Sequence, residues 1–347
     1  SGNTPRSDGG VRMQFSEESN VKLSKISIDV WDSFEEKFGV DIQYRKAGYL
    51  LLAREEETAS QFKKDVAMQN RLGVPSELLT PEEAEKHCPE LNSDLYRLAT
   101  FCPVDGFTDP YLALQGYAKA AQDIGVDVRT NSEVTNVLRE GDTIRGVETR
   151  QNDLKADFVV NATGAWARRF AELAGISIPV APRRRQPSLV VPEKPVSELH
   201  PLVSDLDTGM YFRPERDGHA IVGGHFGDHD KDVHPDTYSK GVDYNLAATA
   251  IEQASECANH FGPESELKKG WAGLYAVTPD HNPILEETIP GFINAVGFSG
   301  HGFQHAPATG KIVADLVEKG STDLVDISPF QSDRFEDISL ETEQNMI

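Results

Sequence analysis

Apolar side chains near the start of the chain recur at the spacing of a helix. In residues 21–38 they occupy every third or fourth position, at Leu23, Ile26, Val30, Phe34 and Phe38. This spacing places them on one face and predicts a helix, which the following Gly39 is suited to end.

Two further helices are predicted at residues 56–73 and 80–88. In the second, Thr80 is a favourable N-cap residue and Pro81 suits the first helical position. Runs of β-branched and aromatic residues predict strands in the ranges 44–53 and 95–109, the latter as two short pieces around a turn.

The middle of the chain continues with a helix and several strands. A helix is predicted at residues 109–125. Strands are predicted after it, at 126–130, 134–150 and 156–164, and the second of them contains a hairpin turn at 140–142. The last strand is a continuous apolar run, which is typical of a sheet buried on both faces. It ends in the small residues Ala162 to Gly164, and a helix is expected at 165–175. This order predicts a ligand site at the carboxyl end of the strand.

Residues 181–270 have a different character, with frequent prolines and short alternating segments. They predict an antiparallel sheet followed by a helix at 245–262. The tail after Pro329 is acidic, and we expect it to be peripheral.

Charge and hydropathy restrict the function. The chain has 347 residues and a net charge of −22, from 56 acidic and 34 basic residues. Nucleic-acid binding, which needs a basic stripe, is therefore not expected. No apolar run approaches the ~20 residues of a membrane span. The acidic residues are spread along the chain, which a solvated, self-repelling surface would explain. Adaptation to high salt, where screening weakens the mutual repulsion, is the other interpretation and the one that we favour.

The three cysteines, Cys88, Cys102 and Cys257, are far apart and form no CxxC pair. A disulfide framework or a cysteine zinc site is therefore not expected. They are predicted to be small buried residues in a reducing cytoplasm.

The stretch GFSGHGFQHAPATGK at residues 297–311 holds the candidate chemistry. His301 and His305 are four apart, but Gly302 and Pro307 disfavour a regular helix there, so that a helix is expected to open only near Ala308. A metal site of the H-E-x-x-H type would also need a carboxylate between the two histidines, and none is present.

Two other interpretations of short motifs fail on their residues. A nucleophile elbow around Ser299 would need glycine where His301 stands. A calcium loop needs glycine where Val233 stands and glutamate where Ser239 stands, although acidic and histidine residues precede them, at Asp228, His229, Asp230, Asp232 and His234. A solvated acidic loop is the simpler interpretation of that segment.

The remaining interpretation is a cradle for an anionic ligand. Gly300 and Gly302 would let backbone N–H groups approach such a ligand closely, and a helix N-terminus would face the same place. On these residues alone, a structural turn that leads into a helix explains the pattern equally well.

A family resemblance favours the cradle. The stretches GLYAVTPDHNPIL and GFINAVGFSGHGFQHAPATGKIVADL resemble the C-terminal flavin-binding signature of the D-amino-acid oxidase superfamily, in its sarcosine oxidase, dimethylglycine dehydrogenase and glycine oxidase branch. The resemblance extends, in the family's order, over SGNTPRSDGGVRMQFSEESN, SEVTNV, VVNATGAWARRFAELAG and YFRPERDGHAIVGG.

The resemblance implies an α/β (α+β) fold, in which a three-layer FAD-binding domain is interleaved with an antiparallel-sheet substrate domain. The FAD domain would comprise residues 1–40, 106–180 and 271–328, the substrate domain 41–105 and 181–270, and the acidic tail 329–347. The family's N-terminal G-x-G-x-x-G unit does not occur here, so we expect this chain to be an incomplete one that binds FAD weakly.

The family's site residues can be carried over to matching positions. Cofactor contacts are expected at Thr4, Ser7, Gly9, Gly10, Val134, Ala162, Gly164, Trp166, Gly273, Gly300, His301, Gly302, Phe303 and Gln304. The residues expected to face the substrate are Arg12, Tyr211, His225 and Gln304. Arg12 would bind a carboxylate, because its planar guanidinium forms two parallel hydrogen bonds with one.

Departures from the family pattern refine the expectation. Gly273 replaces the cysteine that attaches FAD covalently in some members, so the FAD should be noncovalent. Ile221 and Gln304 stand where other members carry lysines, which predicts a dehydrogenase that passes electrons to a quinone or a protein partner rather than to oxygen.

The resemblance thus implies an FAD-dependent oxidoreductase that oxidises a small amine or amino-acid carboxylate by hydride transfer to flavin. Two alternatives are a 2-hydroxy acid dehydrogenase that feeds a quinone and a flavin-fold assembly or scaffold factor without turnover.

Overall fold

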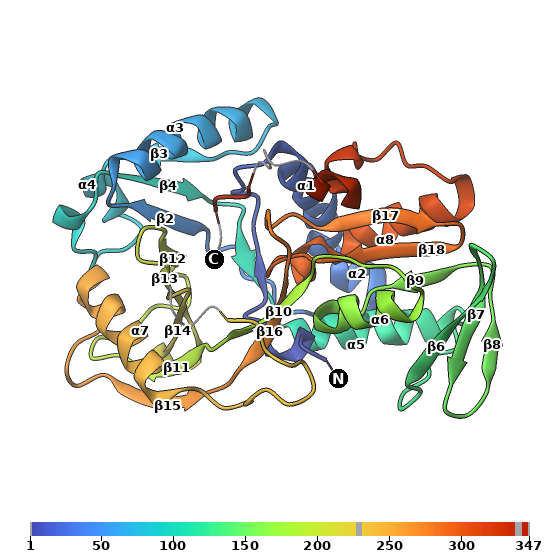
Figure 1. Ribbon diagram of the computed structural model, residues 1–347. Coiled ribbons are helices and arrows are strands. Elements are labelled where there is room, and N and C mark those ends of the chain that lie inside the picture. Colours follow the sequence, from blue (N-terminus) through green and yellow to red (C-terminus); the bar gives the residue numbers. More distant parts are fainter. Residues whose placement is uncertain (1, 227–230, 337–341, 346–347) are drawn as a thin grey trace.

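The computed structural model describes residues 2–226, 231–336 and 342–345, which form two lobes side by side (Figure 1). One lobe is built on an eight-stranded sheet and the other on a three-stranded sheet. We call them the eight-stranded lobe and the three-stranded lobe. The mixture of helices and sheets confirms the expected fold class. None of the described helices is both long enough and apolar enough to cross a membrane.

The eight-stranded sheet contains segments from two distant parts of the chain. Its order is β15 (Glu266–Gly270), β11 (Ser188–Val191), β14 (Ala220–Gly224), β13 (Met210–Pro214), β12 (Leu202–Asp205), β2 (Tyr49–Ala53), β4 (Leu98–Cys102) and β3 (Glu77–Leu79). All neighbours are antiparallel except β12 and β2, which are parallel. The sheet confirms the antiparallel pattern predicted for residues 181–270.

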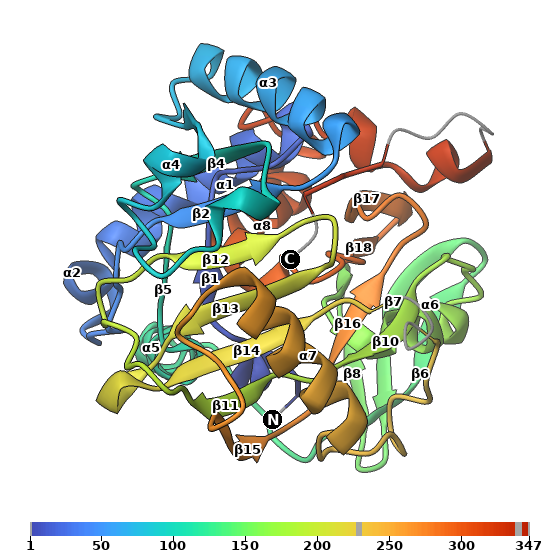
Figure 2. The ribbon, with the colours of Figure 1, turned by 90° about the vertical axis from the view of Figure 1, so that its left-hand side faces the viewer.

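Helices cover the eight-stranded sheet. Helix α7 (Tyr244–Cys257) crosses its strands, as Figure 2 shows, and buries Leu246, Ala250 and Ala254. Helices α3 (Glu56–Arg71) and α4 (Pro81–Ala84) lie near β3 and β4. Helix α4 is shorter than predicted, although Thr80 forms the expected cap: its side chain accepts from the Glu83 backbone N–H, and Glu83 bonds back to Thr80.

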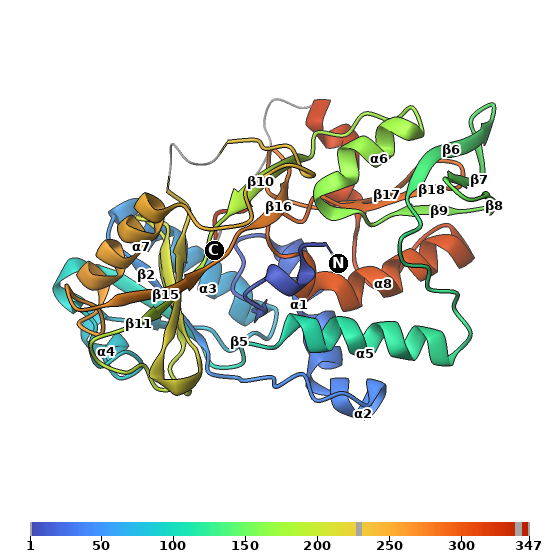
Figure 3. The same cartoon turned by 90° about the horizontal axis from the view of Figure 1, so that it is seen from below.

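The three-stranded sheet is a layer between two sets of elements (Figure 3). Its order is β17 (Ile284–Ile289), β18 (Phe292–Val296) and β9 (Val159–Asn161). Alternate residues of β18 face opposite sides, so that Phe292 packs with the α6 side and Ile293 with the α1 and α8 side. The surrounding elements are α1 (Glu18–Asp32), α2 (Phe34–Phe38), α5 (Pro110–Asp123), α6 (Ala167–Leu173), α8 (Gly302–Lys319), β6 (Val134–Glu140), β7 (Thr143–Thr149) and β8 (Asp153–Lys155).

Two short ribbons complete the fold. Strand β10 (Ala181–Arg185) pairs with β16 (Gly273–Val277), and this ribbon lies between the two lobes (Figure 1). Strand β1 (Gly10–Val11) pairs with β5 (Gly106–Phe107). The domain boundaries proposed from the resemblance stay a prediction.

Two strand predictions for the three-stranded lobe are wrong. Residues 126–130 form no strand: Val126 and Val128 are about half exposed, and no described strand pairs with this segment. Strand β9 lies at the edge of its sheet, and Val160 is 37% exposed, so β9 is not buried on both faces. A continuous apolar run alone did not distinguish an edge position from a central one.

Two helix predictions are also corrected. The helix over residues 21–38 is divided at Ser33 into α1 and α2, and Gly39 ends it in the expected left-handed conformation, with φ 69°. The last helix begins at Gly302, before Pro307 rather than after it. Proline removes one donor from the first turns of α8. Around it, the Ala308 N–H donates to Ser27 Oγ (3.2 Å) and the Gln304 carbonyl accepts from Trp31 Nε1 (2.9 Å), so these two backbone groups have partners outside the helix.

Candidate functional site

A cavity of about 660 Å³ lies where several distant segments of the chain meet. Its walls come from residues 2–8, the turn 162–166, strand β16, the end of β18 and the first turns of α8. The turn after β9 forms one wall, as predicted for the carboxyl end of a strand.

Helix α8 directs its N-terminus at this cavity. Gly302, Phe303 and Ala306 in its first turns line the wall, and no side chain caps the helix at His301. The uncapped N–H groups and the helix dipole favour an anionic group there.

The cavity wall leaves space for a bound group beside two glycines and offers it one hydroxyl. Gly164, with φ 57°, and Gly310 border the cavity, and a Cβ atom at either position would meet no heavy atom within 4 Å. Thr309 Oγ1 lies buried in the wall without a hydrogen-bond partner among the described residues. The volume is within the ~300–1,000 Å³ of ligand sites. These residues therefore fit a cofactor of the size and charge of FAD.

A second pocket of about 60 Å³ adjoins the large cavity. The two share wall residues, which are Ser7, Asp8, Tyr211, Tyr275, Gly300 and Phe303. The small pocket alone is lined by Gly10, Arg12, Tyr49, Leu202, His301 and Gln304. A small ligand there would lie directly beside a group bound in the large cavity.

Arg12 gives the small pocket a buried cation. The residue is 4% exposed, and its guanidinium carbon is 4.0 Å from the centre of the Phe15 ring. The guanidinium donates to the backbone carbonyls of Gln14 and of Asn345, the latter at 2.5 Å. Two of its five N–H donors are thus used within the described part of the chain, which leaves three for a ligand. Burial lowers the pKa of Arg12 and the Glu343 carboxylate raises it, but an arginine stays charged under these conditions.

Asp8 gives the same pocket a carboxylate. One oxygen, Oδ2, accepts a hydrogen bond from the Tyr211 hydroxyl, whereas Oδ1 is buried and has no partner among the described residues. Burial raises the pKa of Asp8, and nearby Arg213 lowers it. The pocket therefore combines free donors on Arg12 with a free acceptor on Asp8.

The two histidines of the glycine-rich stretch are neutral. Burial lowers the pKa of His301 well below its usual value and that of His305 to about 3, and Arg12 adds to both shifts. His305 Nε2 is 2.9 Å from Ser24 Oγ. Neither histidine belongs to a metal-ligand cluster among the described residues. His301 therefore brings no positive charge to the site.

Most of the predicted site residues line one or both cavities. They are Thr4, Ser7, Gly10, Arg12, Ala162, Gly164, Trp166, Tyr211, Gly273, Gly300, His301, Gly302, Phe303 and Gln304. Gln304 Oε1 also accepts from the Arg12 backbone N–H at 2.8 Å, so its amide oxygen holds the backbone directly after β1. The roles assigned to these residues stay predictions.

Three predicted residues line neither cavity. Gly9 forms a turn with φ 72°, where a Cβ atom would lie 2.0 Å from the Thr108 carbonyl oxygen. Val134 begins strand β6, and the ring of His225 is centred 5.7 Å from that of Tyr275. Of the calcium-loop candidates, Asp228, His229 and Asp230 lie outside the described residues, and Asp232 pairs with Arg183 at 3.4 Å.

Several wall residues were missed from the sequence. Asp8 and Arg6 lie in the N-terminal stretch, and Tyr275 lies in the segment GLYAV. Both segments carry the family resemblance, so the predicted site residues beside them could have indicated these three. Arg185 also lines the large cavity, with its guanidinium carbon 5.0 Å from the Tyr275 ring centre. Nothing in the RRR run of β10 distinguished Arg185 from Arg183 and Arg184.

Comparison with known proteins gives a consistent result. The profile of the family described as "DAO: FAD dependent oxidoreductase" matches residues 1–316. The chain is 32% identical to FAD-dependent oxidoreductase domain-containing protein 1 of Bos taurus, over 96% of this chain and 76% of that protein. It is also similar to the mitochondrial dimethylglycine dehydrogenase of Rattus norvegicus (27% identity, 89% of this chain, 38% of that protein). The β subunit of sarcosine oxidase from Arthrobacter sp. is 26% identical, over 96% of this chain and 82% of that protein.

Solved structures show the same fold. L-proline dehydrogenase from P. horikoshii superposes with a TM-score of 0.87 at 34% identity, over 97% of this chain and 88% of that one. Glycine oxidase from Geobacillus kaustophilus superposes with a TM-score of 0.81 at 25% identity, over 96% and 88%. The resemblance found in the sequence is thereby confirmed.

Proposed function

This chain belongs to the DAO family of FAD-dependent oxidoreductases, and from that premise we propose that it oxidises a small amino acid at the bond between the nitrogen and its neighbouring carbon. The observation that carries the proposal is that Arg12 and Asp8 line the same small pocket, which adjoins the cofactor cavity. One group suits a carboxylate and the other suits an amine.

The substrates named for similar proteins have this combination of groups. Dimethylglycine, sarcosine, glycine and L-proline each carry one amine nitrogen and one carboxylate. The 60 Å³ pocket is suited to substrates that are small. It thus favours an amino acid of this size over a long-chain or polymeric amine.

In this proposal, the chain's own residues position the substrate. Free N–H groups of Arg12 bind the carboxylate in two parallel bonds. Asp8 Oδ1 accepts a hydrogen from the amine, while the Tyr211 hydroxyl holds Asp8 in place through Oδ2. Residues 2–8, the 162–166 turn and the α8 N-terminus would hold FAD, which would supply the hydride acceptor. Tyr211 and Tyr275 lie in the wall that the small pocket shares with the large cavity.

We further propose a dehydrogenase that passes electrons to a quinone or a partner protein. Ile221 is buried in β14, so no lysine reaches the site from that position. Arg185 and Arg6 on the cavity wall weigh against this part of the proposal, because fixed cations favour oxygen reduction. Three free, buried cysteines support a reducing compartment such as the cytoplasm.

The test is anaerobic mixing of the FAD-loaded chain with L-proline, sarcosine, dimethylglycine and glycine, and separately with lactate. Loss of the yellow flavin absorbance with at least one amino acid, but not with lactate, is expected. Bleaching by lactate alone would favour the 2-hydroxy acid reaction, and bleaching by none would favour a scaffold role. Acid precipitation of the same sample should leave the colour in the supernatant, because Gly273 offers no attachment point.

A further inference from the structure

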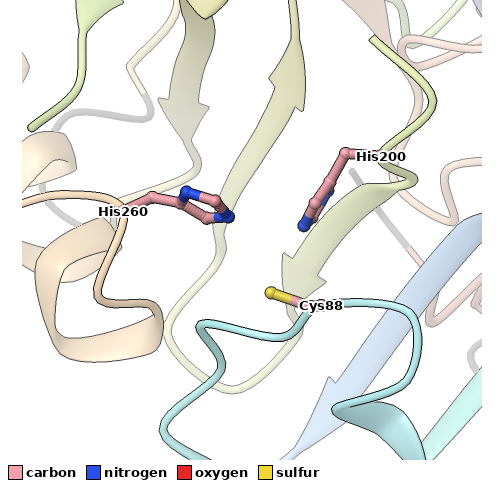
Figure 4. Close-up of side chains that lie close together, drawn as sticks. All are labelled: Cys88, His200 and His260. Carbon is pink, nitrogen blue, oxygen red and sulfur yellow. The ribbon is translucent and has the colours of Figure 1, made fainter. Parts of the chain in front are cut away.

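Three side chains in the eight-stranded lobe form a cluster that the flavin chemistry does not use. Cys88 follows α4, His200 precedes β12 and His260 follows α7, and the three point toward a common space (Figure 4). The Cys88 sulfur and one nitrogen of each histidine all lie within 4.8 Å of one another. All three residues are buried: Cys88 is 0%, His200 6% and His260 7% exposed. None lines either cavity of the flavin site.

Backbone carbonyls determine the protonation of both histidines. His200 Nδ1 is 2.8 Å from the Pro201 carbonyl, and His260 Nδ1 is 3.1 Å from the Lys194 carbonyl. A carbonyl can only accept, so each Nδ1 carries the hydrogen and each Nε2 has a free lone pair. Both Nε2 atoms are buried without a hydrogen-bond partner in the described part of the chain. Buried acceptors of this kind are costly unless something binds them.

We propose that Cys88, His200 and His260 form a binding site for Zn²⁺. Zinc bonds to sulfur at about 2.3 Å and to imidazole nitrogen at about 2.0–2.1 Å, so its tetrahedral ligands lie about 3.3–3.6 Å apart. Since all three atoms lie within 4.8 Å of one another, none of their separations has to shorten by more than about 1.5 Å for this geometry. Metal-bound histidines typically donate their other N–H to a carbonyl, as both do here.

The ligand set selects the class of metal. A thiolate and two imidazoles suit zinc, whereas calcium and magnesium prefer oxygen ligands, and no carboxylate belongs to the cluster. Binding replaces the Cys88 thiol proton with the metal and releases one proton to solvent. Each imidazole can bind the metal without losing a proton, since its Nδ1 carries the hydrogen and its Nε2 has no partner among the described residues.

The bound ion would join three segments that are distant in the chain. It links the loop after α4, the loop before β12 and the loop after α7, around one edge of a shared apolar core. We therefore assign the site a structural role in the eight-stranded lobe, which is independent of the proposed oxidation.

The test uses the full FAD-loaded chain after removal of metals by a chelator. Titration with Zn²⁺ should give one ion and one released proton per chain, together with a higher melting temperature. Co²⁺ should bind in its place and give tetrahedral d–d bands, read as a difference spectrum at longer wavelength than the flavin, and a thiolate charge-transfer band. Absence of stoichiometric uptake of both ions would overturn the proposal.

Variants identify the ligands. Loss of a group that only hydrogen-bonds a metal ligand lowers the metal affinity about 10- to 100-fold. Cys88→Ser or His200→Gln removes a ligand itself and should therefore lower the Zn²⁺ affinity by more than about 100-fold. Cys102→Ala, which removes a buried thiol outside the cluster, should leave the affinity unchanged. Undiminished binding in Cys88→Ser would also overturn the proposal. If that variant fails to fold, the charge-transfer band of the Co²⁺-loaded wild type decides whether a thiolate is a ligand.

Discussion

Arg12 is fixed by contacts that do not involve a substrate. Its backbone N–H is held by Gln304 and its guanidinium by the carbonyls of Gln14 and Asn345. A guanidinium held in this way loses little side-chain entropy when a carboxylate binds. Its orientation therefore matters as much as its charge.

Arg12→Lys should weaken amino-acid binding and leave the flavin content unchanged. A point-charge ammonium loses the second hydrogen bond to the carboxylate, at a cost of about 1.5–3 kcal/mol, or about 10- to 150-fold in apparent affinity. Steady-state kinetics measures the change. Arg54→Lys is the control, because Arg54 pairs with Asp205 away from both cavities. Unchanged affinity in Arg12→Lys would remove Arg12 from the substrate site.

Asp8→Asn should weaken the binding of amino acids. It should not weaken the binding of acetate, which is tested as a competitive inhibitor and has the carboxylate but lacks the amine. A hydrogen bond to a charged acceptor is lost, so the affinity for amino acids should fall about 10-fold. Arg12→Lys should weaken both ligands, which separates the two roles. Equal loss for acetate and for amino acids in Asp8→Asn would contradict an amine contact.

The pH dependence of the same variant tests the charge state of Asp8. Because burial raises the pKa of Asp8 above its ordinary 3.8, kcat/KM should decline on the acid side at a pH above that value as the carboxylate is protonated. Asp8→Asn should lack this acid limb.

At this scale the sequence predicted residues that lie in matched motifs. Arg12, Tyr211 and Gln304 were found in this way, and all three line the small pocket. Asp8 was missed because Asp-Gly-Gly also describes an ordinary turn. Cys88, His200 and His260 are far apart in the chain and form no recognisable metal-binding motif, because only the packing of three loops brings them together.

Helix α8 is the element on which the cofactor site depends most. Its residues Gly302, Phe303, Ala306, Thr309, Gly310 and Val313 line the large cavity, as does the turn that precedes the helix. Sequence periodicity predicted its body but placed its start six residues late, because Pro307 was taken as a barrier. Contacts with Ser27 and Trp31 give the Ala308 N–H and the Gln304 carbonyl partners from α1, and no local sequence pattern shows them.

Gly310→Leu should separate cofactor binding from folding. The position lies within α8, where leucine is favoured over glycine by about 1 kcal/mol, so the apo chain should not be destabilised. Its side chain would enter space next to the cavity, at an overpacking cost of about 1–3 kcal/mol to FAD binding, or about 5- to 150-fold. Flavin fluorescence titration and thermal unfolding measure the two effects. Gly241→Leu, in open space away from the cavity, is the control, and equal FAD affinity in both variants would contradict the assignment.

Helix α3 carries a carboxylate that links stability to pH. Asp65 accepts from Gln61 and from the Asn345 side chain, and burial raises its pKa to about 6. A raised carboxyl pKa means that the folded state binds the proton more tightly. Its contribution to stability is therefore lost as pH rises from about 3.8 through about 6.

Asp65→Asn removes this dependence. The free energy of unfolding of the variant relative to wild type should increase by about 2–3 kcal/mol between pH 4 and pH 7, on top of a constant loss from one hydrogen bond. Denaturant unfolding at several pH values measures it, with the exposed Asp94→Asn as control. A difference that does not change with pH would contradict the raised pKa.

The whole molecule carries a charge of −22 without a basic region to offset it. Repulsion of this kind extends over about 10 Å at 0.1 M salt and only about 3 Å at 1 M. The melting temperature should therefore rise when KCl is raised from 0.1 M to 2 M. A variant with Asp94→Asn, Glu318→Gln and Asp323→Asn should respond less, because three exposed acids are removed. A melting temperature that falls or stays constant would contradict adaptation to high salt.

The substrate pocket around Arg12 brings together residues that are translated early and residues that are translated late. Its hydrogen bonds to Gln304 and Asn345 span 292 and 333 residues. Closing loops of that length is entropically costly and slow, so contacts within each lobe should form first. A nascent chain on the ribosome would therefore already hold folded strands of the eight-stranded lobe while its substrate pocket was still unassembled. Catalytic competence should consequently be among the last properties acquired during folding, and activity regained on refolding should lag behind the recovery of secondary structure.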